Sequence, residues 1–303
     1  MEYESFITEV KECVAQLCPN NDVRLEKIMK NNSCELDGLV IRREGVDVAP
    51  TIYLNSYYSD YLNGRTIENI AAEIVEIDCR SRLDISIDIE EYRNFKIMKN
   101  RIMYKLISFE KNTTLLEKIP YRKYLDFAIV YYCIAMESDG SCATWVITND
   151  FLNIWNVDED VLFETASENT GSYMPVEIKS MPEILKELMP DTYTCELSDY
   201  YEDNIDGRPM MYVATNRQKL FGAGVILYPD VLINFARQYG SFYMLPSSIH
   251  EVIFVPDDGT INYEELKNMV QEVNSTQVQV HEFLSNMIYF YDSHTKELYI
   301  LNK

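Results

Sequence analysis

The chain has 303 residues, 47% of them hydrophobic and 12% aromatic, which is enough for the core of one large or two moderate domains. With 27 basic and 49 acidic residues, its formal net charge is −22. A uniformly acidic chain repels nucleic-acid phosphates and anionic membranes, so we expect neither as a partner, although a basic partner or mimicry of nucleic acid stays open.

The cysteines and the N-terminus point to a cellular compartment. Seven cysteines are scattered without a C-x-x-C pair, as is usual in a reducing environment. The first residues carry neither a basic start nor an apolar signal core, and the longest apolar run, 127–136, is too short to span a bilayer. We therefore expect a cytoplasmic protein.

Residues 1–95 are predicted to form an N-terminal α+β domain of helix, three strands and helix. Apolar residues at helical spacing predict the first helix over 3–17. Strands are predicted at 24–30, 35–43 and 51–54. Asn63-Gly64 is a stop signal, and a second helix begins at Thr66.

Residues 96–303 are predicted to form a strand-rich C-terminal α+β domain. Strands are expected at 102–109, 125–136 and 142–148, with a hairpin turn at 138–141. Helices follow at Asn149, after a cap at Asp158, and over 181–189. The acidic segment 190–209 is either a solvated loop or a divalent-cation site.

Two further strands are expected at 210–215 and 220–228, joined by a turn at 216–219. Gly222-Ala223-Gly224 then lies inside a strand and indicates a bulge or a close backbone contact. Pro229 is expected to open a helix from its first turn. Strands at 287–291 and 298–301 complete an α+β fold, with mostly antiparallel sheets on which helices pack.

The stretch 242–272 organises the C-terminal part. Residues 249–255 are apolar on both faces and predict a covered strand. After a turn at 256–259, Asn262 caps a helix with Glu265 as its capping-box partner. The segment from Asp258 also matches the second half of an EF-hand loop, but Phe254 and Pro256 supply no oxygen ligands, so no metal is expected.

Four residues of this stretch could carry chemistry. His250 could act as a general base that activates Ser247 or Ser248, with help from Asn216 and Glu251. Alternatively, His250 is a hydrogen-bonded histidine at the edge of the core, and the serines lie in a turn begun by Pro246. Asn216 and His250 are our candidate binding residues. No cofactor motif is recognised and none is expected.

Several strings resemble an uncharacterised bacterial family, domain of unknown function 5688, over nearly the whole chain: residues 38–42, 49–54, 63–66, 215–216 with 221–223, and 245–252. More faintly, residues 243–298 resemble the C-terminal part of a second uncharacterised family from Gram-positive bacteria, domain of unknown function 1444. There a histidine precedes a similar strand and capped helix. Neither family has an assigned activity, so the resemblance implies only a bacterial cytoplasmic protein.

Three functions from different classes follow. The first is a non-catalytic binding or regulatory protein with an unknown protein partner. It rests on the lack of a convergent catalytic set and on the first domain, which resembles small acidic secretion-chaperone domains in its order of elements. The second is a serine/histidine hydrolase centred on Ser247, Ser248 and His250. The third is an acidic nucleic-acid mimic, which needs carboxylates at phosphate-like spacing. The sequence predicts no oligomeric state.

Overall fold

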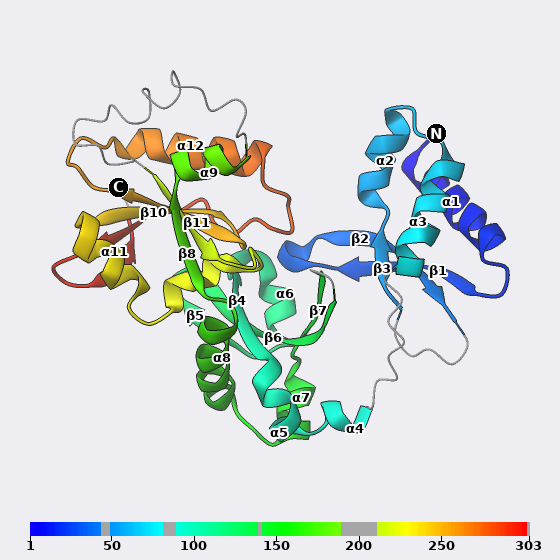
Figure 1. Cartoon of the computed structure of the whole chain (residues 1–303), viewed down its shortest axis with the longest axis horizontal. Helices are drawn as coiled ribbons and strands as arrows, with labels where there is room; N and C mark the ends of the chain where they lie inside the picture. Colours follow the sequence, from blue (N-terminus) through cyan, green and yellow to red (C-terminus); the bar gives the residue numbers. More distant parts are fainter. Residues whose placement is uncertain (44–48, 81–88, 139–140, 189–210, 302–303) are drawn as a thin grey trace. The chain divides into compact units, whose positions relative to one another are not determined.

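A computed structural model describes residues 1–43, 49–80, 89–138, 141–188 and 211–301 (Figure 1). The fold class is α+β, as predicted, and every strand pairing in the described ranges is antiparallel. The chain forms two compact units, Met1–Glu91 and Tyr92–Lys303. The division into two folded domains, 1–95 and 96–303, stays a prediction. No helix in the described ranges has the length and hydrophobicity to cross a bilayer.

The first unit is a three-stranded sheet with helices packed on it. Its strands follow the order β1-β2-β3. Apolar residues spaced by four along α1 and α3, such as Phe6, Val10 and Ile70, are fully buried, because this spacing places them on one helical face. The elements are α1 (Tyr3–Leu17), β1 (Asp22–Met29), η1 (Asn31–Ser33), β2 (Glu35–Arg42), β3 (Thr51–Tyr53), α2 (Asn55–Leu62) and α3 (Ile67–Arg80), and α4 (Ile89–Tyr92) lies at the unit boundary.

Helix α2 was not predicted, because its sequence, NSYYSDYL, has the polar composition of a loop. Tertiary contacts supply what local propensity lacks. The rings of Tyr58 and Tyr61 each lie 5.3 Å from the ring of Phe6 on α1. The side chain of Asn55 accepts a hydrogen bond of 3.1 Å from the backbone of Asp37 on β2. Three aromatic rings and one polar anchor therefore hold a helix that the sequence signals only weakly.

The second unit contains two sheets. The smaller has the order β4-β6-β5, with β7 also paired to β6, and the larger has the order β13-β12-β10-β11-β9-β8. Their strands are β4 (Ile102–Ser108), β5 (Tyr121–Tyr124), β6 (Phe127–Ser138), β7 (Ser141–Val146), β8 (Val176–Ser180), β9 (Tyr212–Asn216), β10 (Phe242–Ser248), β11 (Glu251–Pro256), β12 (Tyr289–Asp292) and β13 (Glu297–Ile300).

Short and long helices connect these strands. They are α5 (Phe95–Met98), η2 (Lys99–Arg101), η3 (Glu110–Asn112), α6 (Thr113–Leu116), α7 (Asn149–Trp155), α8 (Glu159–Tyr173), α9 (Met181–Leu188), η4 (Gly222–Leu227), α11 (Val231–Tyr239) and α12 (Tyr263–Thr276). The predicted N-caps are confirmed, although Glu265 bonds to the side chain of Asn262 and not to its backbone amide, so the predicted capping box does not form. Asp158 accepts from the Val161 amide at 3.0 Å, and Asn262 accepts from the Glu264 amide while its own amide contacts Glu265.

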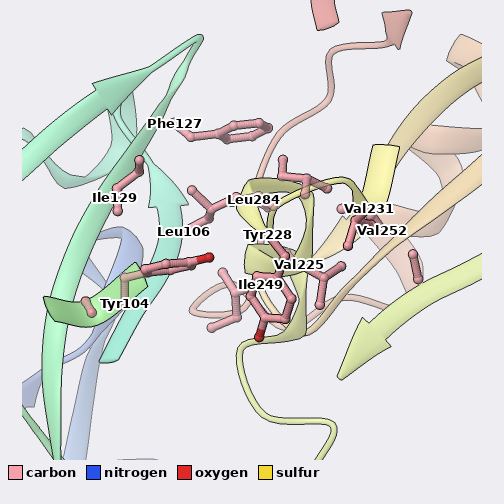
Figure 2. Close-up of a cluster of buried hydrophobic side chains, with 14 of the residues drawn as sticks. Tyr104, Leu106, Phe127, Ile129, Val225, Tyr228, Val231, Ile249, Val252 and Leu284 are labelled. Carbon is pink, nitrogen blue, oxygen red and sulfur yellow. The ribbon is translucent and has the colours of Figure 1, made fainter. Parts of the chain in front are cut away.

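The main core lies between the two sheets (Figure 2). Tyr104 and Leu106 on β4 and Phe127 on β6 lie on one side of this core. Tyr228, which follows η4, and Val252 on β11 lie on the other side. All of these side chains are buried. The short helix η4 enters the same core, with Gly222, Ala223, Gly224, Val225 and Ile226 all buried.

Three local predictions are wrong. Residues 220–228 form no strand but the 3-10 helix η4, so no hairpin turn lies at 216–219; a short apolar run buried on all sides has no period that separates strand from helix. Helix α11 starts at Val231, and Pro229 precedes it, because Asp230 has a left-handed backbone (φ 63°). Strand β10 continues through Ser248, so the serines lie on a strand and not in a turn begun by Pro246.

Candidate functional site

The candidate residues Asn216 and His250 lie at the end of two paired strands. β11 pairs with β9 so that Val252 faces Ala214, which places the end of β9 beside the β10–β11 turn. The Thr215 hydroxyl donates a 2.7 Å hydrogen bond to the His250 carbonyl oxygen. Asn216 and His250, 34 positions apart in sequence, therefore lie at the same end of the paired strands.

The chain leaves β9 through a tight loop that Asn216 closes. Asn216 is buried, with 1% exposure, and its side-chain amide donates to the Leu220 carbonyl at 2.8 Å. Its side-chain oxygen accepts from the Leu220 amide at 3.2 Å. The side chain thus makes the paired bonds that a neighbouring strand would make, and it fixes the path from β9 into η4.

Gly222 starts η4 against the strand end. A Cβ atom there would lie 2.1 Å from the Thr215 Oγ1 and 2.3 Å from the His250 carbonyl oxygen. Real Cβ atoms do not approach oxygen so closely, so only glycine fits. The predicted close backbone contact at Gly222 is confirmed, although the strand around it is wrong.

The His250 side chain supports the same loop. Its Nδ1 accepts a 3.2 Å hydrogen bond from the Phe221 backbone amide, and its ring stacks on the Phe221 ring at 5.6 Å and 17°. Because Nδ1 is an acceptor, the neutral ring carries its proton on Nε2, which lies 3.6 Å from a Glu282 carboxylate oxygen. Phe221 has a left-handed backbone, with φ 52°. The imidazole therefore holds a strained residue in place.

The two serines bond to different partners. The Ser248 Oγ accepts from the His250 backbone amide at 3.0 Å. The Ser247 hydroxyl donates to the Glu251 carboxylate at 3.3 Å. Neighbouring residues on a strand point to opposite faces, although a bulge between Pro246 and Ser248 interrupts the pairing here. The four candidates thus form two sets, and their catalytic assignment stays a prediction.

Three residues of this site were not singled out from the sequence. Phe221 links the loop to His250, Lys105 on β4 places its Nζ 4.2 Å from the Phe221 ring centroid, and Glu282 faces His250. The Ile249 amide also donates to the Glu282 carbonyl at 2.8 Å. The positive φ at Phe221 has no signal in the sequence, and Glu282 lies in a loop with no motif.

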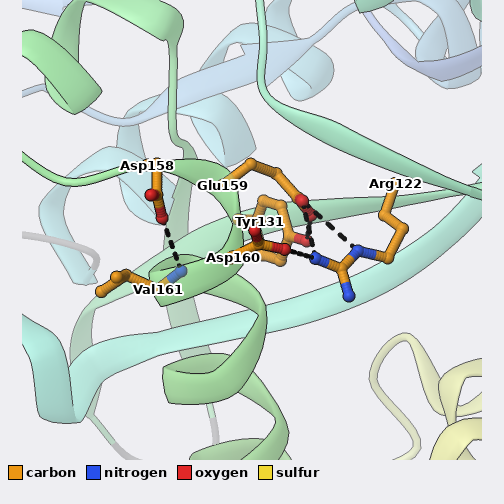
Figure 3. Close-up of polar contacts among 6 residues, drawn as sticks. All are labelled: Arg122, Tyr131, Asp158, Glu159, Asp160 and Val161. Carbon is orange, nitrogen blue, oxygen red and sulfur yellow. Dashed lines mark hydrogen bonds and ion pairs between the residues drawn. The ribbon is translucent and has the colours of Figure 1, made fainter.

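A second polar cluster joins the smaller sheet to helix α8 (Figure 3). Arg122 on β5 bonds to Glu159, with its closest contact at 2.8 Å, and also to Asp160. The Tyr131 hydroxyl donates to the same Glu159. Burial and the adjacent carboxylate raise the pKa of Tyr131 well above its usual range, so it stays a donor. The two acids also suit the positive helix N-terminus, and the cluster is structural.

A third cluster crosses between the sheets of the second unit. Asp126 accepts from the Ser285 hydroxyl at 2.7 Å and from the Tyr289 hydroxyl at 2.5 Å. Burial, with the Asp126 charge, raises the pKa of Tyr289 far above its usual range. Both donors come from the C-terminal part of the chain, so this cluster ties the β5–β6 turn to β12.

The two sequence features considered for metals differ in outcome. The acidic segment 190–209 lies outside the described residues. Asp258 has a local role, because its carboxylate accepts from the amide and the hydroxyl of Thr260, and these bonds lower its pKa. Within the described ranges, no group of three or more His, Cys, Asp or Glu side chains is arranged to hold a metal ion.

The comparisons with known proteins give a family match over a range that contains the strings named above. A family model described as a family of unknown function (DUF5688) matches residues 3–293. No curated protein and no solved structure matches the chain. Two of the strings that carry the resemblance, 215–216 with 221–223 and 245–252, supply most of the site around His250.

Proposed function

The chain belongs to the DUF5688 family of unknown function, and from that premise we propose that it is a non-catalytic binding or regulatory protein that acts through protein–protein contacts. We further propose a bacterial, cytoplasmic setting. One observation carries the proposal. The imidazole Nδ1 of His250 already accepts a hydrogen bond of 3.2 Å from the Phe221 backbone amide, so this nitrogen serves to hold the loop.

A general base needs a ring nitrogen that can reach the nucleophile. The Nε2 atom of His250 faces the Glu282 carboxylate at 3.6 Å, while Ser247 donates to Glu251 and Ser248 accepts from a backbone amide. Each group has a local partner that explains its presence. These contacts give the residues a structural role, in which they hold the loop and the strand ends in place. A structural role for them favours a binding protein over an enzyme.

A serine hydrolase is the second candidate, and one observation favours it. The Ser247 hydroxyl and the Glu251 carboxylate are in contact, and His250 is half-buried, so all three are reachable from solvent. For catalysis, His250 would have to give up its bond to Phe221 or turn its Nε2 towards a serine. The acidic nucleic-acid mimic remains a third proposal, supported only by the net charge of −22.

The decisive experiment is chemical labelling of the intact chain with a fluorophosphonate probe, read by intact and peptide mass. We expect no adduct on Ser247 or Ser248, and no hydrolysis of generic ester substrates beyond that of the His250→Ala variant. An adduct on either serine that disappears in His250→Ala would replace the binding proposal with the hydrolase.

A positive test uses the tagged chain expressed in its native host, with partners cross-linked and quantified. We expect a partner in stoichiometric amount, recovered equally by the wild type and by the Ser247→Ala and Ser248→Ala variants. Recovery of DNA-binding proteins only, competed away by added duplex DNA, would support the mimic instead.

A further inference from the structure

The acidic charge of the chain is not uniform, although we treated it as uniform when we predicted its partners from the net charge. Residues 93–123 contain nine of the 27 basic residues and two of the 49 acidic ones, Glu110 and Glu117. Their formal net charge is +7, and that of the remaining chain is −29. Like charges that lie close together repel one another, so a basic segment of this size destabilises the fold. Its presence in so acidic a protein therefore calls for an explanation.

Four lysines of this segment belong to elements at one face of the smaller sheet, and we call them the basic face: Lys105, Lys111, Lys118 and Lys123. In the strand register, Lys105 aligns with Val130 of β6 and Lys123 aligns with Ala128. Residues two apart on β6 point to the same face, so both lysines lie on the side of the small core that contains Val130 and Ala128.

The other two lysines flank that small core. Lys111 lies in η3, and Lys118 follows α6, whose Leu116 packs into the core. Lys111, Lys118 and Lys123 are exposed. Among the described residues, Lys118 and Lys123 have no carboxylate within ion-pair distance, whereas most cations of the first unit do.

Aromatic rings are interleaved with these lysines. The Lys123 Nζ lies 4.5 Å from the centroid of the Phe109 ring, which in turn lies 5.9 Å from the ring of Tyr121. Tyr121 is 38% exposed, a large fraction for an aromatic side chain on a strand. The basic face therefore offers apolar contact as well as positive charge.

The same face ends at an open sheet edge. β5, with the sequence YRKY, is the last strand in the order β4-β6-β5 and pairs with β6 alone in the described ranges. Alternate residues of an edge strand present amide and carbonyl groups outward, ready for another strand. On the opposite face of β5, the Arg122 charge is already taken by Glu159 and Asp160 (Figure 3).

We propose that the β5 edge and the basic face bind an extended acidic segment of a partner protein, which adds to the smaller sheet as a further strand. Backbone hydrogen bonds to β5 supply the pairing, and carboxylates on the segment meet Lys118 and Lys123. An aromatic or aliphatic side chain between them packs on Tyr121. The inference rests on the proposed binding function and names its partner class.

The lysines have a protective effect that agrees with this choice of partner. Lysine on an edge strand opposes aggregation, because pairing two copies of β5 sets like charges opposite each other. An acidic strand removes that repulsion. The edge is thus selective by charge.

A nucleic acid fits the surroundings less well. A DNA duplex carries a negative charge at roughly every 1.7 Å of its axis. The rest of the same unit, residues 124–303, has a formal net charge of −19 and repels a polyanion that extends beyond the basic face. A short peptide places its few carboxylates only where the lysines are. The exposed Tyr121 and Lys123 lie two residues apart on β5, on the same face, which matches the alternating side chains of an added strand better than a run of stacked bases.

The test is a fluorescence-anisotropy titration of the full chain with a labelled peptide of about eight alternating glutamate and valine residues, the length of a long strand. Two matched probes accompany it: one with lysine in place of glutamate, and one with proline in place of valine, which cannot join a ladder. We expect binding of the glutamate–valine peptide alone, weakened by added salt.

The variant Lys118→Glu with Lys123→Glu is expected to lose at least tenfold in affinity. The control, Lys186→Glu with Arg237→Glu, makes the same change of charge on exposed residues of α9 and α11 and should bind as the wild type does. Urea unfolding followed by tryptophan fluorescence shows that both variants are folded. Equal losses in the two variants would overturn the inference, because they would report net charge and not a site.

Other outcomes also decide. Equal binding of the proline peptide would remove the added strand. Tighter binding of a single-stranded oligonucleotide than of the peptide, lost in the Lys118/Lys123 variant, would reassign the face to nucleic acid. Self-association that the same variant abolishes would make a second copy the occupant. In each case the proposed binding function stands or falls separately, through the serine-labelling experiment.

Discussion

The Cβ position of Gly222 lies 2.3 Å from the carbonyl oxygen of His250. This contact joins the start of η4 to the β10–β11 turn, and it depends on the absence of a side chain. It gives a direct test of how the site is built.

Gly222→Ala is predicted to lower the free energy of unfolding of the second unit by about 2–4 kcal/mol, because backbone and the Thr215 side chain must move to admit a methyl group. The measurement is urea unfolding followed by tryptophan fluorescence. Trp145 and Trp155, the only two tryptophans of the chain, both lie in the second unit, so the signal reports that unit.

Gly171→Ala is the matched control. Gly171 lies within α8, where an added Cβ would meet only the Tyr228 ring at 3.9 Å, an ordinary contact. Alanine favours a helix over glycine, so this variant is expected to be neutral or more stable by up to about 1 kcal/mol. Similar losses in both variants would show that the close contact at Gly222 is not the cause.

The hydrogen bond from Phe221 to His250 gives a second prediction. His250→Ala is expected to cost about 1–2 kcal/mol of unfolding free energy, because the half-buried Phe221 amide loses its acceptor. His250→Asn places an acceptor near the position of Nδ1 and should recover part of that loss. The same tryptophan-monitored unfolding measures both variants.

His250→Phe separates the two contacts of the ring. It keeps an aromatic ring to stack on Phe221 and removes the acceptor. If the phenylalanine variant is as stable as the wild type while His250→Asn is as weak as His250→Ala, stacking and not the hydrogen bond holds the loop.

Much of the fold is readable from local signals. The helix 3–17 follows from apolar spacing, and the caps at Asp158 and Asn262 follow from side chains that accept backbone amides. These features are decided within a few residues of sequence. The helices α2 and η4 are decided by contacts with distant residues, such as Phe6 for α2 and His250 for η4, and local propensity carries no trace of them.

The candidate site shows the same division. Asn216 and His250 could be selected from residue type and position. Their common role, which is to hold residues 220 and 221 in a strained path, requires the pairing of β9 with β11 and the left-handed Phe221. The basic segment, by contrast, is visible in the sequence and was hidden only by averaging charge over the whole chain.

Cysteine reactivity gives a third prediction. Cys133 lies on β6 with no exposed surface, and burial raises the pKa of its thiol to about 12. At pH 8 its thiolate fraction is then about one part in ten thousand, so alkylation by iodoacetamide should be negligible in the folded chain. Cys79, which is exposed at the end of α3, is expected to react readily.

Peptide mass spectrometry after timed alkylation measures both sites. Labelling in urea is the control, because it should make the two cysteines react at similar rates. Rapid labelling of Cys133 without denaturant would show that β6 opens on the time scale of the experiment.

Helix α9 begins with a capping box whose charge predicts a dependence on pH. The Glu183 carboxylate accepts from both the amide and the hydroxyl of Ser180 at 2.7 Å, and the Ser180 hydroxyl accepts in turn from the Glu183 amide. These bonds hold the pKa of Glu183 below its usual range. Linkage gives the sign: the carboxylate stabilises the helix start at neutral pH, and this contribution is lost as the pH falls through the lowered pKa.

Glu183→Gln is therefore predicted to weaken the first turn of α9 by about 0.5–1 kcal/mol at pH 7, since Glu183 is exposed and water screens part of its charge. The difference from the wild type should shrink below pH 4 and vanish once both chains lack the charge. Hydrogen exchange of the α9 amides, corrected for intrinsic rates at each pH, measures it. Glu187→Gln, at the other end of the helix, is the control: it removes the ion pair with Lys179 at 2.8 Å but leaves every hydrogen bond between Ser180 and Glu183 in place, so the first turn should keep its dependence on pH. A difference between Glu183→Gln and the wild type that persists unchanged to pH 3 would show that the side-chain shape, and not its charge, stabilises the turn.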